Sequence, residues 1–380
     1  VRVVKSFVRE DYETKKFDDI SEEICEDFTK AEKTLAYNMP LMQLAMYLSI
    51  ILICWVGARL IITTGGSPVT GFSTGELMSM LTYVMQILMS LMMLSMIFVM
   101  VTMSQASARR IVEVLDETSD LTDGEKAVKV VRDGGIDFDH VSFSYSGDKE
   151  RLSLKDVELH IPSGATVGIL GGTGSAKSTL VSLIPRLYDV TQGDVKVGGV
   201  DVRDYDLEAL RQQVSVVLQK NELFSGTIKD NLRWGNENAT DADMLHACKQ
   251  AQADEFIHGF PDKYDTRIEQ GGTNVSGGQK QRLCIARALL KKPKILIMDD
   301  STSAVDTRTD ALIRKAMREE MPETTKLIIA QRVSSVQDAD MIVVLDNGAI
   351  SDVGTHDELL QTSEIYQEVY NTQQKGGLDQ

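Results

Sequence analysis

The stretch VGILGGTGSAKST, residues 167–179, decides the fold of the larger part of this chain. Its first four residues predict a buried strand, and a helical run begins at Leu180. A glycine-rich loop between a strand and a helix is typical of a phosphate-binding loop, because its amides and the helix N-terminus face the anion. We expect the following loop residues to hold the phosphates of a nucleotide: Gly171, Gly172, Thr173, Gly174, Ser175, Ala176, Lys177, Ser178 and Thr179.

Three positions of this loop carry particular expectations. Lys177 is placed to reach the β- and γ-phosphates, and the hydroxyl of Ser178 is placed to ligate Mg²⁺. Ala176 stands where the usual pattern has glycine, and it adds a Cβ to a loop that often needs glycine dihedrals or a close approach of phosphate. We therefore expect a nucleotide site whose affinity is altered at Ala176. For this motif alone, a glycine turn without a ligand is the alternative.

Two stretches further along the chain fit the same chemistry. The run KILIMD, residues 294–299, predicts a second buried strand, and Asp299 at its end would hold Mg²⁺ from the far side of the phosphate. The run NVSGGQKQR, residues 274–282, leads into a helix, so that Ser276 and the two glycine amides form another anion seat. Its place about 20 residues before the acid-ended strand strengthens the assignment.

The composition divides the 380 residues into an apolar and an acidic part. The formal net charge is −16, and an acidic surface repels phosphate backbones, so a nucleic-acid-binding role is disfavoured. The length predicts two or three domains. Nearly all long apolar runs lie between Pro40 and Met103, which indicates that this part belongs in a membrane and the rest in the cytosol.

The apolar part predicts two membrane spans. Residues 41–62 and 77–103 are each long enough to cross a hydrocarbon core of roughly 30 Å, whereas a buried soluble helix is the alternative. Basic residues lie before the first span and, as Arg109 and Arg110, after the second, so both flanks are expected in the cytoplasm and the loop Thr63–Glu76 outside. We expect a multi-pass protein of the inner membrane, in contact with lipid, whose soluble domain is cytoplasmic.

Methionines follow one face of the second span. They recur at intervals of three and four residues, and a helix places such positions on one side. Two interpretations remain open: an adaptable wall for diverse apolar substrates, or packing against lipid and other helices. The methionines are Met85, Met89, Met92, Met96, Met100 and Met103.

The order of patterns predicts the domain organisation. Residues 1–115 form a cytosolic amphipathic helix and the two spans, residues 116–135 a polar linker, and residues 372–380 a flexible tail. From Ile136 short strands alternate with helices, which predicts a mainly parallel sheet covered by helices. The fold class expected is thus a two-span helical membrane segment followed by an α/β phosphate-loop ATPase domain.

Six motifs in family order carry a resemblance. They are VSFSYSG with Tyr145, the loop GGTGSAKST, VVLQKNELFSGTI with Gln219, NVSGGQKQR, ILIMDD, and the segment from Ser303 to Asp306. Residues 136–371 resemble the nucleotide-binding domain of an ATP-binding cassette (ABC) transporter, which includes a helical subdomain. Residues 1–115 resemble the C-terminal part of an exporter's transmembrane domain.

The resemblance implies ATP and Mg²⁺ as cofactors and gives each motif a role. Tyr145 would stack on adenine, and Gln219 would contact Mg²⁺ and couple to the membrane domain. Asp306 belongs to the D-loop. The implied metal ligands are Ser178, Gln219 and Asp299, and the signature that faces a partner's ATP comprises Val275, Ser276, Gly277, Gly278 and Gln279.

Two further positions depart from the family pattern. Asp300 stands where hydrolytic members have Glu, and one methylene less withdraws the carboxylate of this catalytic position by roughly 1.5 Å. Gln331 stands where the switch histidine is expected, and an amide can hydrogen-bond a γ-phosphate but cannot carry its proton. With Ala176 these departures fall on one ATP site, whereas the signature is intact. Independent drift without consequence is the alternative.

In this family, two domains sandwich two ATP molecules, each between one chain's phosphate loop and the other's signature. The chain therefore resembles the degenerate-site subunit of a heterodimeric bacterial multidrug exporter. It would lend its signature to a partner subunit that has Glu and His, and the pair would carry hydrophobic small molecules. A dedicated lipid or peptide exporter, an ATP-gated regulatory or channel-like membrane protein, and a soluble cassette ATPase are the competing interpretations.

Overall fold

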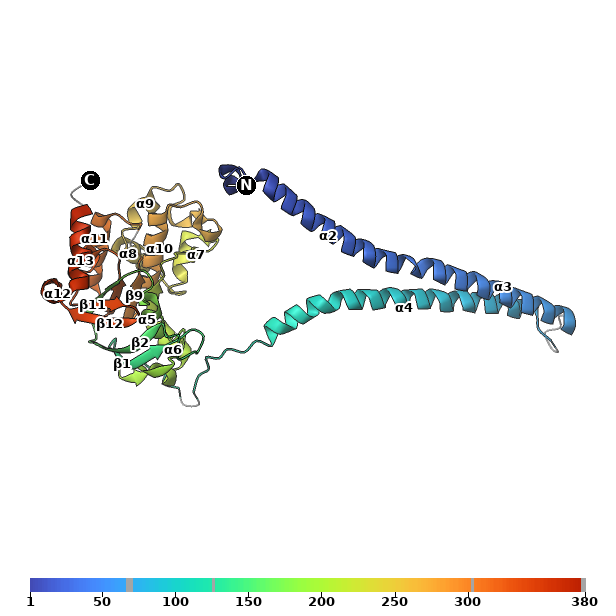
Figure 1. The fold of residues 1–380 in the computed structure, drawn as a ribbon, viewed down its shortest axis with the longest axis horizontal. Coiled ribbons are helices and arrows are strands. Elements are labelled where there is room, and N and C mark those ends of the chain that lie inside the picture. The colour runs from blue at the N-terminus through green and yellow to red at the C-terminus, as the bar shows by residue number, and fades with distance from the viewer. Residues whose placement is uncertain (66–70, 125–126, 302–303, 377–380) are drawn as a thin grey trace. The chain divides into compact units, whose positions relative to one another are not determined.

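A computed structural model describes residues 1–65, 71–124, 127–301 and 304–376. The chain forms two compact units, Val1–Thr118 and Ser119–Gln380 (Figure 1). The boundary between the units falls within the linker that the sequence predicts at residues 116–135.

The first unit is helical. It contains α1 (Arg2–Ser6), α2 (Glu10–Ala36), α3 (Asn38–Thr64) and α4 (Thr74–Leu115). Helix α3 ends at Gly65, whose positive φ of 72° suits a glycine after a helix, and α4 begins with a capping box between Ser73 and Glu76.

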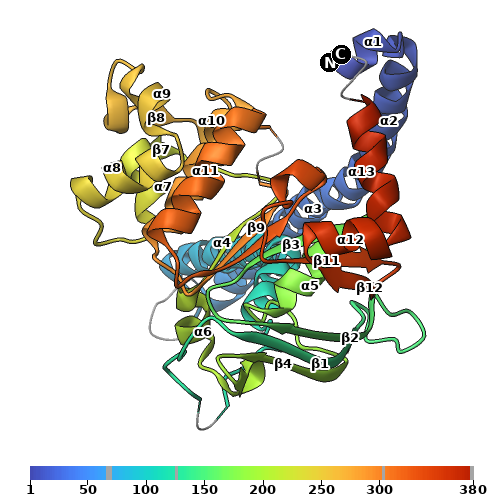
Figure 2. The ribbon, with the colours of Figure 1, turned by 90° about the vertical axis from the view of Figure 1, so that its left-hand side faces the viewer.

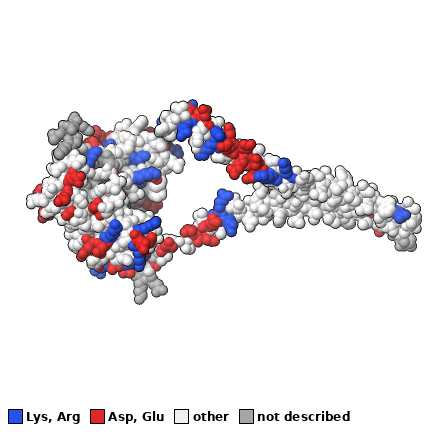
Figure 3. Space-filling view, viewed as in Figure 1, with Lys and Arg blue, Asp and Glu red and all other residues white. Residues whose placement is uncertain are grey.

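Helices α3 and α4 are long and apolar enough to cross a membrane. Figure 3 shows almost no charged side chains along them, whereas acidic and basic side chains cover α2 and the C-terminal end of α4. The two helices contact each other: Asn38 donates a hydrogen bond to Ser95 at 3.2 Å. A Cβ at Gly57 would lie 2.5 Å from the side chain of Leu77, so glycine permits the close approach there.

The second unit contains the mainly parallel sheet that the sequence predicts. Its strand order is β12-β11-β3-β10-β9-β6, and only β12 runs antiparallel. These strands are rich in Val, Ile and Leu because both faces of such a sheet are covered. The bounds are β3 (Thr166–Gly171), β6 (Val214–Val217), β9 (Ile295–Asp299), β10 (Thr325–Ile329), β11 (Met341–Asp346) and β12 (Ala349–Gly354).

A separate antiparallel sheet packs in the same unit, and sequence analysis had not distinguished it from the parallel one. Its order is β2-β1-β4-β5, with β1 (Ile136–Phe143), β2 (Leu154–Ile161), β4 (Gln192–Val197) and β5 (Val200–Asp201). Alternate residues of β1 and β2 enter one hydrophobic core with the parallel sheet and α5. A short pair, β7 (Gly226–Thr227) and β8 (Arg267–Ile268), completes the strands of the described residues.

Helices cover the sheets in two further groups (Figure 2). One group has its own apolar core, which confirms the helical subdomain; the other packs α12 and α13 beside β11 and β12. The helices of this unit are α5 (Lys177–Leu183), α6 (Leu207–Gln213), α7 (Ile228–Arg233), α8 (Asp241–Gln250), α9 (Asp254–His258), α10 (Gly277–Leu290), α11 (Thr307–Glu320), α12 (His356–Thr362) and α13 (Glu364–Gly376).

The C-terminal segment differs from its prediction. Helix α13 continues to Gly376, so residues 372–376, which the sequence analysis assigned to a flexible tail, are helical. Residues 371–374 are polar and exposed, so their local periodicity does not distinguish these helical residues from a tail.

Candidate nucleotide site

The carboxyl ends of three parallel strands bring the predicted residues together. Strand β10 lies between β3 and β9, and Ile329 pairs with Ile169 on one side and Asp299 on the other. The phosphate loop follows β3, the acidic pair ends β9, and Gln331 follows β10. Ligands of open parallel sheets bind at this edge, so the topology alone places these groups in one site.

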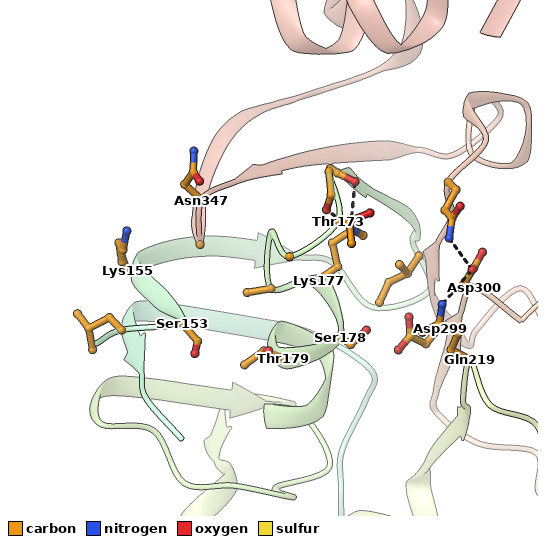
Figure 4. Close-up of a pocket in the computed structure, with 18 residues that line it drawn as sticks. Ser153, Lys155, Thr173, Lys177, Ser178, Thr179, Gln219, Asp299, Asp300 and Asn347 are labelled. Atoms are coloured by element: carbon orange, nitrogen blue, oxygen red, sulfur yellow. Dashed lines mark hydrogen bonds between the residues drawn. The ribbon is translucent and has the colours of Figure 1, made fainter. Parts of the chain in front are cut away.

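A cleft of about 670 Å³ lies at this edge (Figure 4). Most residues of the predicted loop line it, together with Gln219, Asp299, Asp300 and Gln331. Sequence analysis missed the remaining lining residues, which reach the cleft from the loop before β2, from β2 itself, from β10 and from the β11–β12 hairpin: Leu152, Ser153, Lys155, Ile329, Asn347 and Gly348.

The backbone of the loop leaves space for an anion. A Cβ added at Gly172 or Gly174 would meet no atom of the described residues within 4 Å, and Gly174 has a φ of 84°. Gly171, by contrast, faces the carbonyl oxygen of Leu345, which a Cβ would approach to 2.2 Å. The loop thus has one glycine required by packing and two that leave a concave, open surface of amides.

Ala176 adopts the conformation that glycine usually supplies. Its φ is 70° and its ψ is 23°, in the left-handed region, where a Cβ costs roughly 1–2 kcal/mol. It immediately precedes α5, so the strained residue sets the direction in which that helix begins.

Lys177 folds back on its own loop. Its ammonium donates to the carbonyl oxygens of Gly171 at 2.9 Å and Gly172 at 2.7 Å, and to the hydroxyl of Ser175 at 3.2 Å. Burial lowers the pKa of the Lys177 ammonium, and the nearby carboxylates of Asp299 and Asp300 partly oppose this effect. The Lys177 ammonium lies over the loop. A phosphate group bound there would replace its hydrogen bonds to carbonyl oxygens with a stronger ion pair.

The Asp300 side chain links Gln219 and Gln331, which belong to two different loops. One of its oxygens, Oδ2, accepts hydrogen bonds from the side-chain amides of Gln331 at 2.9 Å and Gln219 at 3.3 Å (Figure 4). Burial raises the pKa of the Asp300 carboxyl, while the hydrogen bond from Gln219 opposes that change. The Asp300 backbone also has a positive φ of 45°, a conformation that Asp tolerates better than most residues.

The donor set of the cleft fits Mg²⁺. Ser178, Gln219 and Asp299 all line it, and each carries an oxygen of the kind that Mg²⁺ prefers. In the described part of the chain, no cluster of three or more His, Cys, Asp or Glu side chains is arranged to hold a metal by itself. This composition suits an ion that shares its ligands with bound phosphates.

Tyr145 lies beside the loop but outside the lining of the cleft. Its hydroxyl is 3.0 Å from that of Thr179, and its ring packs edge-on against Phe143 and Tyr188. The side chain is 60% exposed, so one face of the ring is accessible to a flat ligand.

The signature residues are organised as a helix start away from this cleft. Ser276 caps α10 and forms a reciprocal capping box with Gln279, with bonds of 3.0 and 3.3 Å. Of the described residues that line the cleft, none comes from residues 275–279. The structure therefore brings the loop, the acidic pair and Gln331 together and leaves the signature apart.

The D-loop contacts the signature helix. The backbone amide of Ala304 donates to Gln281 of α10 at 3.0 Å, and a Cβ at Gly278 would lie 2.8 Å from the Ala304 carbonyl oxygen. Asp306 caps α11, and the hydrogen bonds that it accepts from Thr309 lower the pKa of its carboxyl. Ser303, also assigned to this loop, lies outside the described residues.

Comparison with known proteins decides the family. Residues 154–303 match the family described as ABC transporter, and residues 1–91 match the ABC transporter transmembrane region. YfiB of Bacillus subtilis, named as an uncharacterized ABC transporter ATP-binding protein, is 39% identical over 373 residues, which cover 98% of this chain and 63% of YfiB. The chain belongs to the ABC transporter family.

Two further members of the ABC transporter family support the same assignment. YgaD of Bacillus subtilis, named as a candidate multidrug export ATP-binding/permease protein, is 44% identical over 72% of this chain and 47% of its own length. The solved structure of a bacterial Atm1-family ABC exporter with ATP bound has a TM-score of 0.86 and 31% identity, and covers 98% of this chain and 64% of that one. The chain spans less than two thirds of these proteins, and its fold is a helical transmembrane region followed by an α/β ABC ATPase domain.

Proposed function

We propose that this ABC transporter chain is part of one subunit of an ATP-driven exporter of the bacterial inner membrane. The phosphate loop holds ATP, with Ser178, Gln219 and Asp299 around Mg²⁺, which neutralises phosphate charge when bound. Helices α3 and α4 cross the membrane, and the ATPase domain is cytoplasmic, in accord with the basic residues that flank the spans. The relationship to exporters and the lining of the cleft support this assignment.

We further propose that the chain's own ATP site hydrolyses poorly. A general base must lie within hydrogen-bond reach of the attacking water, and Asp300 has a shorter arm than the glutamate of hydrolytic members. Its Oδ2 already accepts two amide N–H groups, from Gln219 and Gln331. The Gln331 amide can donate a hydrogen bond to the phosphate but supplies neither a transferable proton nor a positive charge. The site is suited to retain ATP rather than to cleave it.

The signature supports the opposite role at a second site. The capping box between Ser276 and Gln279 holds the first turn of α10 with its amides directed toward an anion, as helix N-termini do. Because residues 275–279 lie outside the chain's own cleft, their ligand would be an ATP bound by another subunit. A partner subunit with Glu and His would perform the hydrolysis, and the two subunits would form a heterodimer.

The substrate class follows from the membrane part. Helix α4 exposes the methionines of the predicted stripe, and flexible thioether side chains adapt to apolar ligands of varied shape. We propose hydrophobic small molecules as substrates and multidrug efflux as the activity, in line with the names of relatives such as YgaD.

The observation that carries the proposal is the Asp300 carboxylate, which accepts hydrogen bonds from the side-chain amides of Gln219 and Gln331 in a domain whose signature helix is intact. It is tested in the complex of the full-length chain and its partner with Gly277→Asp. Among the described residues, a Cβ at Gly277 comes within 4 Å of the Ala304 Cβ alone, at 3.7 Å, so a side chain can be added there. The new carboxylate would lie against the partner's ATP. We expect ATPase activity to fall at least about tenfold, which corresponds to roughly 1.4 kcal/mol.

Asp300→Asn in the same complex is the matched control, because it removes a charge from the chain's own site. We expect its ATPase activity to stay within about twofold of the unsubstituted complex, since Asp300 contributes little as a base. Gly277→Asp is a sharper probe than Ser276→Ala, which would also remove a helix cap. Full activity in Gly277→Asp, or a large loss in Asp300→Asn, would contradict the proposed division of roles.

A further inference from the structure

The turn after β10 carries Gln331, which lines the cleft and which the proposed function places toward the γ-phosphate. We call residues 331–333 the switch turn; it begins with Gln331 and continues into Val333, which is buried. The Gln331 side-chain amide is fixed on Asp300 at 2.9 Å, but this bond sets only the end of the side chain. The position of the turn itself depends on what holds its backbone.

A single side chain holds the backbone of the switch turn at both ends. Gln373 of α13 donates from Nε2 to the carbonyl oxygen of Gln331 at 2.7 Å, and its Oε1 accepts the backbone amide of Val333 at 2.9 Å. Donor and acceptor of one amide are both used, so the geometry also fixes the orientation of that amide. Gln373 lies 42 residues beyond Gln331 in the sequence.

The body of α13 is anchored, so Gln373 projects from a fixed support. Tyr366 of α13 is 1% exposed and belongs to the same apolar core as Val333 and Val336, and Val369 and Tyr370 pack against that core. His356 contacts the Tyr366 hydroxyl at 2.7 Å, which ties α12 to the same helix. A rigid helix that presents a bidentate amide is a defined support for a functional loop.

We infer that Gln373 is a positioning residue for γ-phosphate recognition by this chain's ATP site. It holds the switch turn where the Gln331 amide can reach the third phosphate, and thereby gives the site a preference for ATP over ADP. The inference rests on the proposed nucleotide site. It also assigns the end of α13 a role in nucleotide discrimination, so residues near the C-terminus act on the cleft through the backbone of residues 331–333.

A comparison of ATP and ADP binding distinguishes positioning by Gln373 from a general effect on the domain. ADP would use the loop, Lys177 and the neighbourhood of Tyr145, whereas the hydrogen bonds of the Gln373 side chain within the described residues go to Gln331 and Val333. Only the γ-phosphate depends on the switch turn. Loss of the two hydrogen bonds of Gln373 should therefore weaken ATP binding and leave ADP binding unchanged, whereas general damage to the domain would weaken both.

The test compares Gln373→Leu with Gln374→Leu in the full-length protein. Gln374 is exposed on the same turn of α13 and, within the described residues, makes no side-chain hydrogen bond, so it is a matched control for helix propensity and hydrophobicity. Titrations with Mg·ATP and Mg·ADP give the ratio of the two dissociation constants. We expect Gln373→Leu to reduce the preference for ATP by about threefold to tenfold, the range for loss of one net hydrogen bond, and Gln374→Leu to leave it unchanged.

A second experiment, in the Gln331→Leu variant, tests whether Gln373 acts on ATP binding through the Gln331 side chain. Gln373→Leu added to Gln331→Leu should cause no further loss of ATP preference, because the two hydrogen bonds of Gln373 act on the nucleotide only through the Gln331 side chain. An unchanged preference in Gln373→Leu, an equal loss of ATP and ADP affinity, or a full additional loss on the Gln331→Leu background would each overturn the inference. Failure of the unsubstituted protein to bind either nucleotide would overturn the proposed ATP site as well, and so is distinguishable.

Discussion

Two regions of one domain, the edge of the parallel sheet and the start of α10, differ in how closely they follow the ABC family pattern. At the sheet edge, Asp300 and Gln331 form an amide–carboxylate pair where hydrolytic relatives would have Glu and His, and Ala176 stands in a left-handed conformation. At the start of α10, Ser276 and Gln279 keep a complete capping box. The departures from the family pattern are thus confined to the sheet edge, and the helix start retains its cap.

The difference fits the proposed function, in which the two regions serve separate ATP molecules. A residue that acts on the chain's own nucleotide must line the 670 Å³ cleft, and Asp300 and Gln331 do so. The signature lies apart from that cleft, so it is free to remain competent while the cleft changes. Substitutions at the two regions should therefore have effects that differ in size and in the subunit affected.

The largest expected change comes from restoring the sheet edge to the hydrolytic pattern. Asp300→Glu combined with Gln331→His should raise turnover in this chain's own site at least about tenfold, because a positioned general base contributes 10²–10⁴-fold. Single-turnover hydrolysis by the complex, with the partner's site disabled, measures the gain. Asp300→Glu with Gln331 retained is the control, and we expect it to give less than the pair because Gln331 cannot accept or carry a proton. No gain from the pair would place the limiting defect at Ala176 or at the partner's signature.

A smaller change is expected at Ala176. Ala176→Gly should stabilise the second unit by about 0.5–1 kcal/mol, because relief of the left-handed strain exceeds the entropy that glycine loses on folding. Thermal unfolding with and without Mg·ATP measures the effect, and ATP affinity should rise or stay equal. Gly171→Ala is the opposite control: its Cβ would lie 2.2 Å from the Leu345 carbonyl oxygen, so it should destabilise. A lower stability in Ala176→Gly would show that the alanine methyl contributes packing that outweighs its strain.

The fold was predictable where local pattern and topology agree. Apolar runs predicted β3 and β9, and a glycine loop after the first run located the phosphate site, because these signals are short-range. The separate antiparallel sheet was not predicted, since the strands around Ile136 and Leu154 look alike whether they pair in one sheet or two. The order of strands is set by long-range pairing that periodicity does not report.

The site was predictable by residue type but not by contact. The sequence identified Asp300 and Gln331 as departures, yet the hydrogen bonds of both Gln331 and Gln219 to one carboxylate oxygen depend on the arrangement of three strand ends. Lys155 and Asn347 were missed because they reach the cleft through long-range packing, in which the Lys155 amide donates to the Gly348 carbonyl oxygen of the β11–β12 hairpin at 2.8 Å. Gln373 was assigned to a tail because its partners lie 40 and 42 residues earlier, beyond any local pattern.

The most direct test of the division of roles is the chemical form of the nucleotide that each subunit retains. The complex of the full-length chain and its partner is given Mg and a radiolabelled azido-ATP, freed of unbound nucleotide during turnover, and crosslinked by ultraviolet light. Separation of the subunits then shows which nucleotide each one holds. We predict intact triphosphate on this chain and diphosphate on the partner. Equal amounts of diphosphate on both subunits, or rapid hydrolysis by an assembly of this chain alone, would contradict the account.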